Sequence, residues 1–538
     1  MRTLLKLSNF CLRIRHQITL LILTPCRAKV DEQLAKLVHF STTIFNGTTL
    51  VDATYDGPNY WFRFSLLRVA KGLSYGREIG VIGPFRQKEI RQTLDKLGIH
   101  EHVYFPTHSE PLDEYLCIAQ AYVESLTSPD DLLTWRLPFG IPTWDLYDSI
   151  LKHQRQAYLD INHPDLIFHV AKYLRDLYAT ERIVRDIQPN LAVLSHTASG
   201  RTNIGTIVWH LLRRGIPIIV PQGGFGNLTH FKITKYEDIF SHPNRPTPSD
   251  IANLPLERRN LLQQAGKSYI ERRLNGNARD LAAIQAFKDG RAFIDLPTLC
   301  SLYGWQCDKP IIGVFASVWF DNPHTYGMTE FRDFYDWLQV TIQIATQSDH
   351  VNWLFKPHPS EGWYGGVTLS DMLPGSLPSH IRIASEQWDG ACLRKCLHGI
   401  VTLHGTAGVE MTAIGKPVLA ASRGWYTDIG FVKYTATRRE YELSLSSQWW
   451  QEINMSKAQT LAQIFAGFYF CQPASPHNIT LMDDSYQHKL YPGLLDLLVN
   501  HHDKILNEID TMNAWLKSDI QHYHVYKMCL ADSYYIPD

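Results

Sequence analysis

The stretch "TLHGTAGVEMTAIGKPVLAASRGWYTDIGF" (402–431) combines a strand end, a tight turn, a short helix and a second strand. The apolar run "GIVTLHG" (399–405) predicts a buried strand, and "KPVLAAS" (416–422) predicts the next one. Gly415 lies between them, where a glycine commonly ends a helix. A strand, a helix and a second strand in this order form the repeating unit of a parallel sheet.

Working outward, the same alternation recurs in two blocks of the chain. In the second block, "PIIGVFASVWF" (310–320) and "VNWLFKPHP" (351–359) predict strands, with an amphipathic helix over 331–347 between them. In the first block, short buried strands are predicted at 78–84, 102–106, 190–196 and 216–224, with a further strand just before Asp52. We therefore predict an α/β fold with two doubly wound domains that face a cleft, in which ligands bind at the carboxyl ends of the strands.

The predicted division of the chain has four parts. An N-terminal basic and amphipathic segment covers 1–45, followed by an α/β domain at 46–295 and a second at 305–480. A helical extension covers 485–538. The apolar run in the first segment is too short to span a bilayer, so that segment either lies on the cytoplasmic face of a membrane or packs on its own protein.

Composition excludes several classes of function. The 538 residues carry a net charge of -1, so no global basic field attracts nucleic acid, and no nucleic-acid partner is expected. The nine cysteines form no CxxC pair and fit free thiols in a reducing cytoplasm. Neither an Asp-x-Asp triplet nor an HExxH motif occurs, so we expect no metal site and no cofactor.

The turn in the opening stretch has the residues of an anion site. Gly405 and Gly408 allow close backbone approach, and Thr406 is placed to cap the helix that follows. A helix N-terminus offers N–H groups to a phosphate, and Glu410 is placed to accept hydrogen bonds from ribose hydroxyls. The alternative is that any strand-to-helix turn prefers small residues, and a glutamate stabilises a helix N-terminus without any ligand.

A second motif, "FKPHPSEG", follows the neighbouring strand. Lys356 and His358 come at its end, where both could face an anion, and an imidazole can donate a proton to a departing phosphate oxygen. The same His-Pro dipeptide in "NHPDL" (162–166) precedes a helix and is typical of a cap. The dipeptide alone is therefore weak evidence for a ligand site. At 358–359 the evidence is strengthened by the strand that precedes it and by the turn at the end of the neighbouring strand.

Candidates for the acceptor side lie in the first block. Asp56, in "YDGPN", could be a catalytic carboxylate, although Asp-Gly-Pro is also an ordinary turn. Asp52 and Arg63 are secondary candidates in the same region. His196 and Gln222 end two further predicted strands and could hold an acceptor or a donor sugar.

The two motifs of the second block resemble those of bacterial capsule polysaccharide synthesis proteins, a family that includes β-Kdo transferases. The resemblance rests on "KPHP" (356–359) and "HGTAGVEMTAIGKPVLAASRGWYTDIGF" (404–431), extends over about 190–435, and does not reach the first 150 residues. It implies a GT-B glycosyltransferase, with two Rossmann-like domains and no metal requirement. His358 and Pro359 would contact the phosphate of a CMP-sugar, with Lys356 beside them. The resemblance further assigns the phosphate to the turn and the ribose to Glu410; the residues of the turn are His404, Gly405, Thr406, Ala407 and Gly408.

The resemblance thus predicts transfer of Kdo or a similar acidic sugar from a CMP donor to a surface polysaccharide or glycolipid. The C-terminal domain would hold the nucleotide and the N-terminal domain the acceptor. The resemblance assigns no catalytic carboxylate; from its place in the chain, Asp56 is our first candidate to activate the acceptor hydroxyl or attack the sugar. Two alternatives remain open at this point. One is a CDP-glycerol or CDP-ribitol phosphotransferase of the teichoic-acid type, and the other is a non-catalytic scaffold subunit of a polysaccharide export complex.

Overall fold

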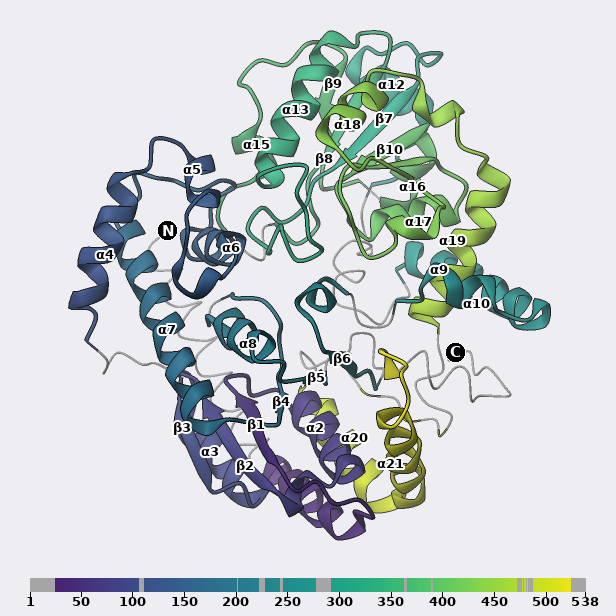
Figure 1. The fold of residues 1–538 in the computed structure, drawn as a ribbon. Helices are drawn as coiled ribbons and strands as arrows, with labels where there is room; N and C mark the ends of the chain where they lie inside the picture. Colours follow the sequence, from purple (N-terminus) through teal and green to yellow (C-terminus); the bar gives the residue numbers. More distant parts are fainter. Residues whose placement is uncertain are drawn as a thin grey trace, which may run out of the picture.

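The computed structural model of the chain describes residues 25–105, 111–200, 202–221, 228–241, 245–276, 292–361, 365–388, 390–471, 477, 479, 481 and 487–523. Two six-stranded sheets dominate it, one in each half of the chain (Figure 1). Helices flank each sheet, so the molecule is α/β with two Rossmann-like domains, as the sequence predicts.

The first sheet has the strand order β3-β2-β1-β4-β5-β6. All neighbouring pairs are parallel except β5 and β6. The strands are β1 (Thr48–Ala53), β2 (Arg77–Ile82), β3 (Glu101–Tyr104), β4 (Leu191–Val193), β5 (Ile218–Val220) and β6 (Phe231–Ile233).

The second sheet is entirely parallel, with the order β12-β11-β10-β7-β8-β9. Its strands are β7 (Ile311–Phe315), β8 (Asn352–Lys356), β9 (Ile381–Ile383), β10 (Gly399–Thr402), β11 (Val418–Ala420) and β12 (Lys433–Tyr434). Both sheets therefore have the strand order of the Rossmann fold, and the order reverses between β1 and β4 in one and between β7 and β10 in the other.

Most helices occupy the connections between these strands, and α18 to α21 follow the last strand. In the first half they are α2 (Pro58–Lys71), α3 (Gln87–Lys96), α4 (Asp113–Glu124), α5 (Pro129–Leu133), α6 (Thr143–Gln154), α7 (Leu166–Ile187), α8 (Ile204–Arg213), α9 (Pro248–Ala252) and α10 (Leu256–Leu274). In the second half they are α12 (Leu296–Tyr303), α13 (Phe334–Gln347), α15 (Leu369–Met372), α16 (Gly390–Cys396), α17 (Ala407–Ala413), α18 (Arg438–Leu445), α19 (Met455–Phe470), α20 (Gln487–Asn500) and α21 (His502–Leu516).

Burial follows the apolar pattern of the strands, with one exception. All five residues of β7 are buried, as are five of the six residues of β1. The strand predicted at 102–106 does form as β3, but the prediction that it is buried is wrong, because three of its four residues are exposed. It is the edge strand of its sheet and has only β2 beside it.

The start of helix α13 is set by a side-chain cap. The helix predicted over 331–347 begins at Phe334, because Asp333 is extended and its side chain accepts a hydrogen bond from the Asp336 N–H.

The short strands β9 and β12 and the antiparallel strand β6 were not predicted. Each has only two or three residues, too few to show a period of two along the sequence.

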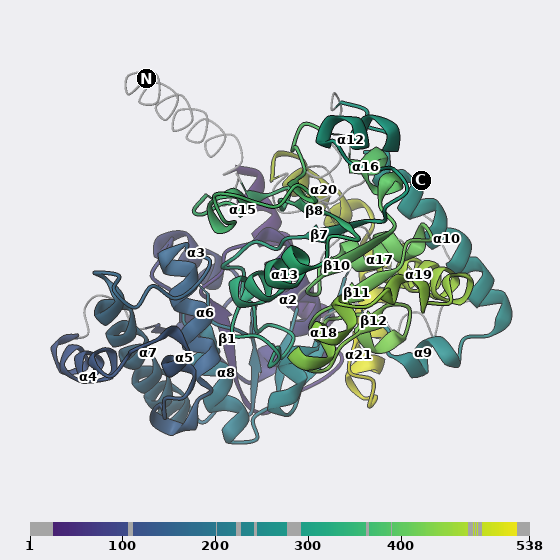
Figure 2. The same ribbon diagram turned by 90° about the horizontal axis from the view of Figure 1, so that it is seen from above.

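Two helical segments cross between the predicted domains. Helix α10, placed in the N-terminal domain by the prediction, packs along α19 in the C-terminal half (Figures 1 and 2). The C-terminal helices return in the opposite direction, and α21 packs on α2 of the first domain (Figure 1). These exchanges tie the two halves together through apolar contacts.

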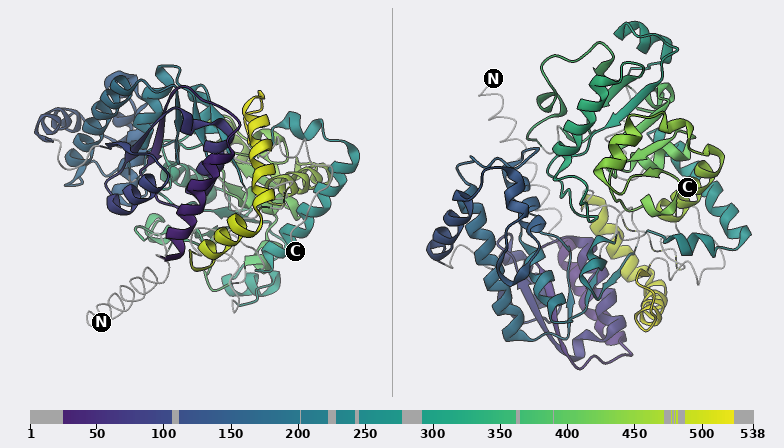
Figure 3. Two further views of the ribbon diagram at one scale, coloured as in Figure 1. Left: turned by 90° about the horizontal axis from the view of Figure 1, so that it is seen from below. Right: turned by 45° about the horizontal axis from the view of Figure 1, so that its top comes forward.

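The part of the N-terminal segment that the structure describes packs on its own protein. Residues 25–36 are helical, and the buried side chains of Val30 and Leu34 join a core formed with α2 and α20 (Figure 3). Residues 1–24 lie outside the described residues, as does the membrane-surface prediction that falls on them. Among the described helices, none combines the length and the apolar character that crossing a bilayer requires.

Candidate active site

A cavity of about 670 Å³ lies in the C-terminal half, at the carboxyl ends of three adjacent strands. Strands β7, β8 and β10 each end at it, on both sides of the position where the strand order reverses. Open parallel sheets bind ligands at this position because the connections leave the sheet in opposite directions there. Its charged or titratable lining residues are Arg273, Asp321, Tyr326, Lys356, His358, Arg394, His404 and Glu410.

The "KPHP" motif lies where the sequence predicts it. Lys356 is the last residue of β8, and Lys356, His358 and Pro359 all line the cavity. The Lys356 ammonium lies 5.4 Å from the centre of the Phe315 ring at the end of β7. The aromatic ring and the ammonium group thus lie at the ends of neighbouring strands and line the same cavity.

His358 has a defined proton position. Its Nδ1 atom accepts a hydrogen bond from the Ser360 N–H at 3.2 Å, so the proton of the neutral ring is on Nε2. Enclosure by protein, with a further contribution from the charge of Lys356, lowers the pKa of His358 from 6.5 to about 4. At neutral pH the ring is therefore an uncharged N–H donor, and an anion beside it would raise its pKa.

The opening turn faces the same cavity. His404, Gly405, Thr406 and Ala407 line it, whereas Gly408 lies behind them. The prediction that Thr406 caps α17 is wrong, because Thr406 already has helical backbone angles and its side chain makes no capping hydrogen bond. The backbone N–H of Glu410 bonds instead to the Thr406 carbonyl, at 3.2 Å.

The two ends of the stretch 402–431 are joined by Tyr426. Its hydroxyl donates to the Gly405 carbonyl at 2.8 Å, and its ring is fully buried. Gly408 leaves the room that this contact needs, because a Cβ atom at position 408 would lie 2.0 Å from the Tyr426 hydroxyl oxygen. The turn is therefore shaped by a residue about twenty positions further along the chain.

Gly408→Ala is expected to destabilise the protein by about 1–2 kcal/mol. Overpacking typically lowers the free energy of unfolding by about 1–3 kcal/mol. The better helix propensity of alanine offsets up to about 1 kcal/mol of this loss. Urea unfolding followed by fluorescence measures the change. Gly405→Ala is the matched control, because the nearest atom there, Thr402 Oγ1, lies 3.1 Å away. Equal stability of the wild type and Gly408→Ala would contradict the packing role of Tyr426.

Glu410 is buried between two arginines that the sequence analysis did not identify. Arg273 Nε, from α10, lies 2.7 Å from one carboxylate oxygen, and Arg394 Nη2, from α16, lies 2.9 Å from the other. Burial by itself would raise the pKa of Glu410, but the two guanidinium groups outweigh it, and the pKa lies below its ordinary value of 4.5. The assignment of Glu410 to a ribose stays a prediction, and its described partners are these two cations.

The lining has a basic excess and an aromatic side. Arg273, Lys356 and Arg394 are basic, whereas Asp321 and Glu410 are acidic and each is ion-paired. Tyr326, Phe334, Phe315 and Trp425 contribute aromatic surface. Basic side chains and aromatic rings that line one cavity suit a ligand with an anionic group and a flat apolar part.

His404 is the most enclosed histidine of the lining. The rings of Tyr326 and Phe334 pack against it, with centroid distances of 4.9 and 5.6 Å. Burial, followed by the charge of His324, lowers the pKa of His404 from 6.5 to about 4. The ring is therefore neutral at physiological pH, and its Nδ1 atom is buried with no hydrogen-bond partner among the described residues.

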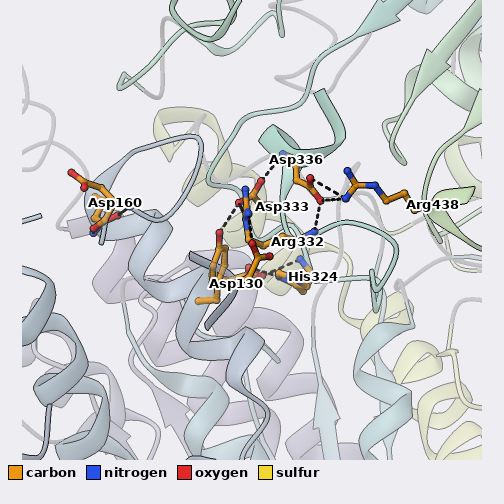
Figure 4. Close-up of polar contacts among 10 residues, drawn as sticks. Asp130, Asp160, His324, Arg332, Asp333, Asp336 and Arg438 are labelled. Carbon is orange, nitrogen blue, oxygen red and sulfur yellow. Dashed lines mark hydrogen bonds and ion pairs between the residues drawn. The ribbon is translucent and has the colours of Figure 1, made fainter. Parts of the chain in front are cut away.

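The loop between β7 and α13 forms one wall of the cavity and is held by the first domain. Buried His324 donates from its backbone N–H and bonds through Nδ1 to Asp148 of α6, at 3.0 and 2.6 Å. Asp333, at the end of the loop, accepts from Tyr147 of α6 at 2.5 Å. Figure 4 shows Arg332 between Asp333 and Asp130, with Asp336 and Arg438 beside them. Helix α6 thereby fixes a wall of the cavity from the opposite domain.

Asp56, predicted as a catalytic carboxylate, does not line this cavity. Arg27 donates to both of its oxygens, at 3.0 and 2.7 Å, and Arg86 lies 3.1 Å away. The Trp61 indole N–H also donates to it, at 3.0 Å. The carboxylate is thus held among two cations and an indole, and its catalytic role stays a prediction.

His196 lies after β4, and its Nδ1 atom is 2.8 Å from the Ser195 hydroxyl. It is not among the lining residues. Lys152, whose charge acts on the His196 ring, pairs with Asp321 of the lining at 2.8 Å. Gln222 lies outside the described residues, so its predicted role is not placed. In the part of the chain that the structure describes, no group of three or more acidic, histidine or cysteine side chains is arranged to hold a metal ion.

Comparison with known proteins gives structural likenesses only. No family model matches the chain, and no curated protein matches it. The KpsC β-Kdo 2,4 transferase of Thermosulfurimonas dismutans has a TM-score of 0.33 and 11% identity, over 56% of this chain and 87% of that one. The Neisseria meningitidis UDP-GlcNAc 2-epimerase bound to UDP-GlcNAc has a TM-score of 0.24 and 11% identity, over 84% of this chain and 99% of that one.

The glycosyltransferase SnogD of Streptomyces nogalater has a TM-score of 0.24 and 12% identity, over 79% of this chain and 98% of that one. The first of these three proteins is of the kind that the sequence motifs resemble. All three TM-scores are low, so the chemistry of this chain rests on its own cavity.

Proposed function

We propose that the protein is a glycosyltransferase that takes a sugar from a nucleotide donor, with CMP-Kdo or a similar CMP-sugar as the donor. The observation that carries this proposal is the cavity at the strand-order reversal of the second sheet, where Lys356, the neutral N–H donor of His358 and two arginines converge. The motif resemblance supplies the choice of cytidine and of an acidic sugar. The acceptor that we propose is a surface polysaccharide or a glycolipid, and the reaction takes place in the cytoplasm.

In this proposal the cavity stabilises the charge that develops when the sugar leaves. The bond between the anomeric carbon and the phosphate oxygen breaks, and the electron pair goes to the phosphate. His358 Nε2–H donates to that oxygen, and Lys356 neutralises part of the charge. Groups placed in advance around a developing anion typically contribute about 10²–10³-fold to the rate, without a metal ion.

Glu410 has an indirect part in this scheme. Both carboxylate oxygens of Glu410 already accept from arginines, so Glu410 fixes Arg273 and Arg394 at the cavity wall. Its negative charge also offsets part of their positive charge. The aromatic residues of the lining would pack against the base and the ribose. We retain the ribose contact of Glu410 as part of the proposal, because each carboxylate oxygen can accept a second hydrogen bond.

Donor incubations test the proposed function. Purified protein is incubated separately with CMP-Kdo, CMP-sialic acid, CDP-glycerol and UDP-GlcNAc, and free nucleotide is measured. The proposal predicts release of CMP from a CMP-sugar. Release of CMP from CDP-glycerol alone would indicate an alditol phosphotransferase, and neither binding nor turnover of any donor would indicate a scaffold protein; either outcome would contradict the proposal.

Nucleotide binding is expected to take up protons near pH 5. The free His358 ring, with a pKa of about 4, is mostly neutral there, and a bound phosphate raises its pKa so that the complex binds an additional proton. The affinity of the wild type for CMP, relative to that of His358→Gln, should therefore increase as the pH falls toward about 4. Calorimetry in two buffers of different ionisation enthalpy counts the protons. Because the CMP phosphate itself titrates near pH 6, His358→Gln is the reference, and an equal proton count in both proteins would contradict the assignment.

A further inference from the structure

A chain of buried polar groups lies at the strand-order reversal of the first sheet. Asp52 is on β1, and Ser195 follows β4, the strand beside it. The two side chains are 0% and 4% exposed, although they are 143 positions apart in the sequence. The cavity of the second sheet lies at the corresponding reversal, so each domain places polar groups at the same topological position.

The Asp52 carboxylate is the acceptor in each of its described hydrogen bonds. One carboxylate oxygen accepts from the Thr54 N–H at 2.7 Å, and the other accepts from the Ser195 N–H at 2.9 Å. The Ser195 hydroxyl makes a short hydrogen bond to that second oxygen. The same hydroxyl oxygen lies 2.8 Å from Nδ1 of His196.

These contacts fix the tautomer of His196. A carboxylate cannot donate, so the single hydroxyl proton of Ser195 is directed at Asp52. The hydroxyl oxygen must then accept from the imidazole, which places the ring proton on Nδ1. Nε2 is left with its lone pair, as in other bases that a buried carboxylate orients through the opposite ring nitrogen.

The lone pair of His196 is available to a ligand. No described residue hydrogen-bonds to Nε2, and the ring is solvent-accessible although protein surrounds most of it. The Tyr55 ring packs edge-on against it, with 5.4 Å between the centroids. The charged groups that face the ring are Asp52 and Lys152; enclosure lowers its pKa below 6.5, Asp52 opposes this decrease, and Lys152 adds to it.

The geometry points to His196 as the general base that deprotonates the acceptor hydroxyl, with Ser195 and Asp52 as positioning residues. This inference rests on the proposed function. In the step, Nε2 takes the proton of the acceptor O–H, the oxygen forms a bond to the anomeric carbon, and the bond from that carbon to the phosphate oxygen breaks. The nucleoside phosphate leaves with the electron pair, and His358 donates to it from the other domain.

The two histidines therefore have opposite tautomers with complementary uses. His358 presents an N–H from Nε2 to the leaving group, whereas His196 presents a lone pair from Nε2 to the attacking group. Lys152, which pairs with Asp321 of the cavity lining, is close enough to His196 for its charge to influence the ring. The carboxylate of Asp56, the alternative base, is held by Arg27 and Arg86, and the exposed His100 of the same domain serves as the control.

The kinetic test measures CMP release from CMP-Kdo with water in place of the acceptor hydroxyl. His196→Ala is expected to lower kcat by about 10²–10⁴-fold, the usual contribution of a general base, with little change in the KM for the donor. His100→Ala, at an exposed histidine of the same domain, should keep a rate within about threefold of the wild type. In the wild type the rate should fall as the pH decreases through the pKa of His196, and Asp52→Asn should move that fall to lower pH, because the Asp52 charge raises this pKa.

A spectroscopic test examines the hydrogen bonds that connect Asp52, Ser195 and His196 without relying on the activity. Long-range ¹H–¹⁵N NMR spectra of histidine-labelled full-length protein report the protonated ring nitrogen, and His196→Gln identifies the signal. The wild type is expected to show His196 protonated at Nδ1 and His358 at Nε2. Ser195→Ala removes the acceptor for Nδ1–H, so the His196 signal should move toward the Nε2–H form while that of His358 stays.

The outcomes are distinguishable. An Nε2–H tautomer for His196 in the wild type, or a His196→Ala rate equal to that of the wild type, overturns the inference while the proposed function stands. Absence of CMP release by the wild type from both CMP-Kdo and CMP-sialic acid overturns it together with the proposed function. Loss of rate in His196→Ala, with retention of the rate in His100→Ala and a tautomer change in Ser195→Ala, supports it.

Discussion

Replacement of His358 by alanine is expected to lower CMP release from a CMP-sugar by at least about 100-fold. The Nε2–H group of His358 is the donor that the cavity offers to the departing phosphate oxygen, and loss of one such donor typically costs about 10²–10³ in kcat. The loss should appear in kcat more than in KM, because the charge develops in the transition state.

A second histidine gives a matched control for this variant. His398 also accepts a backbone N–H at Nδ1, from Ile311 at 3.0 Å, but it precedes β10 and lies outside the cavity lining. His398→Ala should therefore retain the wild-type rate, apart from a modest loss of stability. A wild-type rate in His358→Ala, with an unchanged circular dichroism spectrum, would remove His358 from the leaving-group role.

Replacement of Glu410 by alanine is expected to reduce the stability of the C-terminal half by about 3–5 kcal/mol. Glu410, Arg273 and Arg394 all have side chains that are 4–5% exposed, so removal of the carboxylate leaves two buried guanidinium groups without their counter-charge. The pKa of Glu410 is lowered in the folded protein, so this stabilisation is complete above about pH 4.5 and is lost as the pH falls through the folded-state value.

An exposed ion pair of the same domain is the control for Glu410→Ala. Glu442 lies 3.3 Å from Arg438 on α18, and both side chains are more than 40% exposed, so Glu442→Ala should cost at most about 0.5 kcal/mol. Urea unfolding, with CMP affinity measured alongside, compares the two variants. Equal unfolding curves for them would contradict the buried triad, and an unchanged CMP affinity in Glu410→Ala would contradict its part in the cavity.

The sequence predicted the fold well where strands are long and apolar. Runs such as 310–320 and 351–359 alternate with helices, and these patterns placed two doubly wound domains and the strand ends that carry "KPHP" and the Gly-rich turn. It could not predict that β3 is exposed, since exposure depends on the position of a strand at the sheet edge.

The partners of the predicted residues were harder to identify. The sequence analysis assigns Glu410 to a ligand and not to an arginine. Its partner Arg273 is 137 positions away, and nothing along the sequence connects the two residues. A buried glutamate requires a counter-charge, and this requirement was the available signal, but it does not name the partner. Thr406 was expected to cap a helix on residue type alone, whereas capping needs an extended backbone that Thr406 does not have.

The acceptor side shows the same limit. The sequence analysis makes Asp56 the first candidate for the catalytic carboxylate and Asp52 a secondary one. The structure gives Asp56 two arginine partners and gives Asp52 a hydrogen-bonded connection to His196 through Ser195. Ser195 and His196 are adjacent in the sequence, but their relation to a residue on β1 depends on the pairing of β1 with β4.

A crystal structure with CMP bound tests the central claim most directly. The expected result is density for the nucleotide in the cavity at the ends of β7, β8 and β10, with a phosphate oxygen within hydrogen-bond distance of His358 Nε2 and the phosphate near Lys356. CMP bound elsewhere on the molecule, or a phosphate more than about 4 Å from both side chains, would contradict the account.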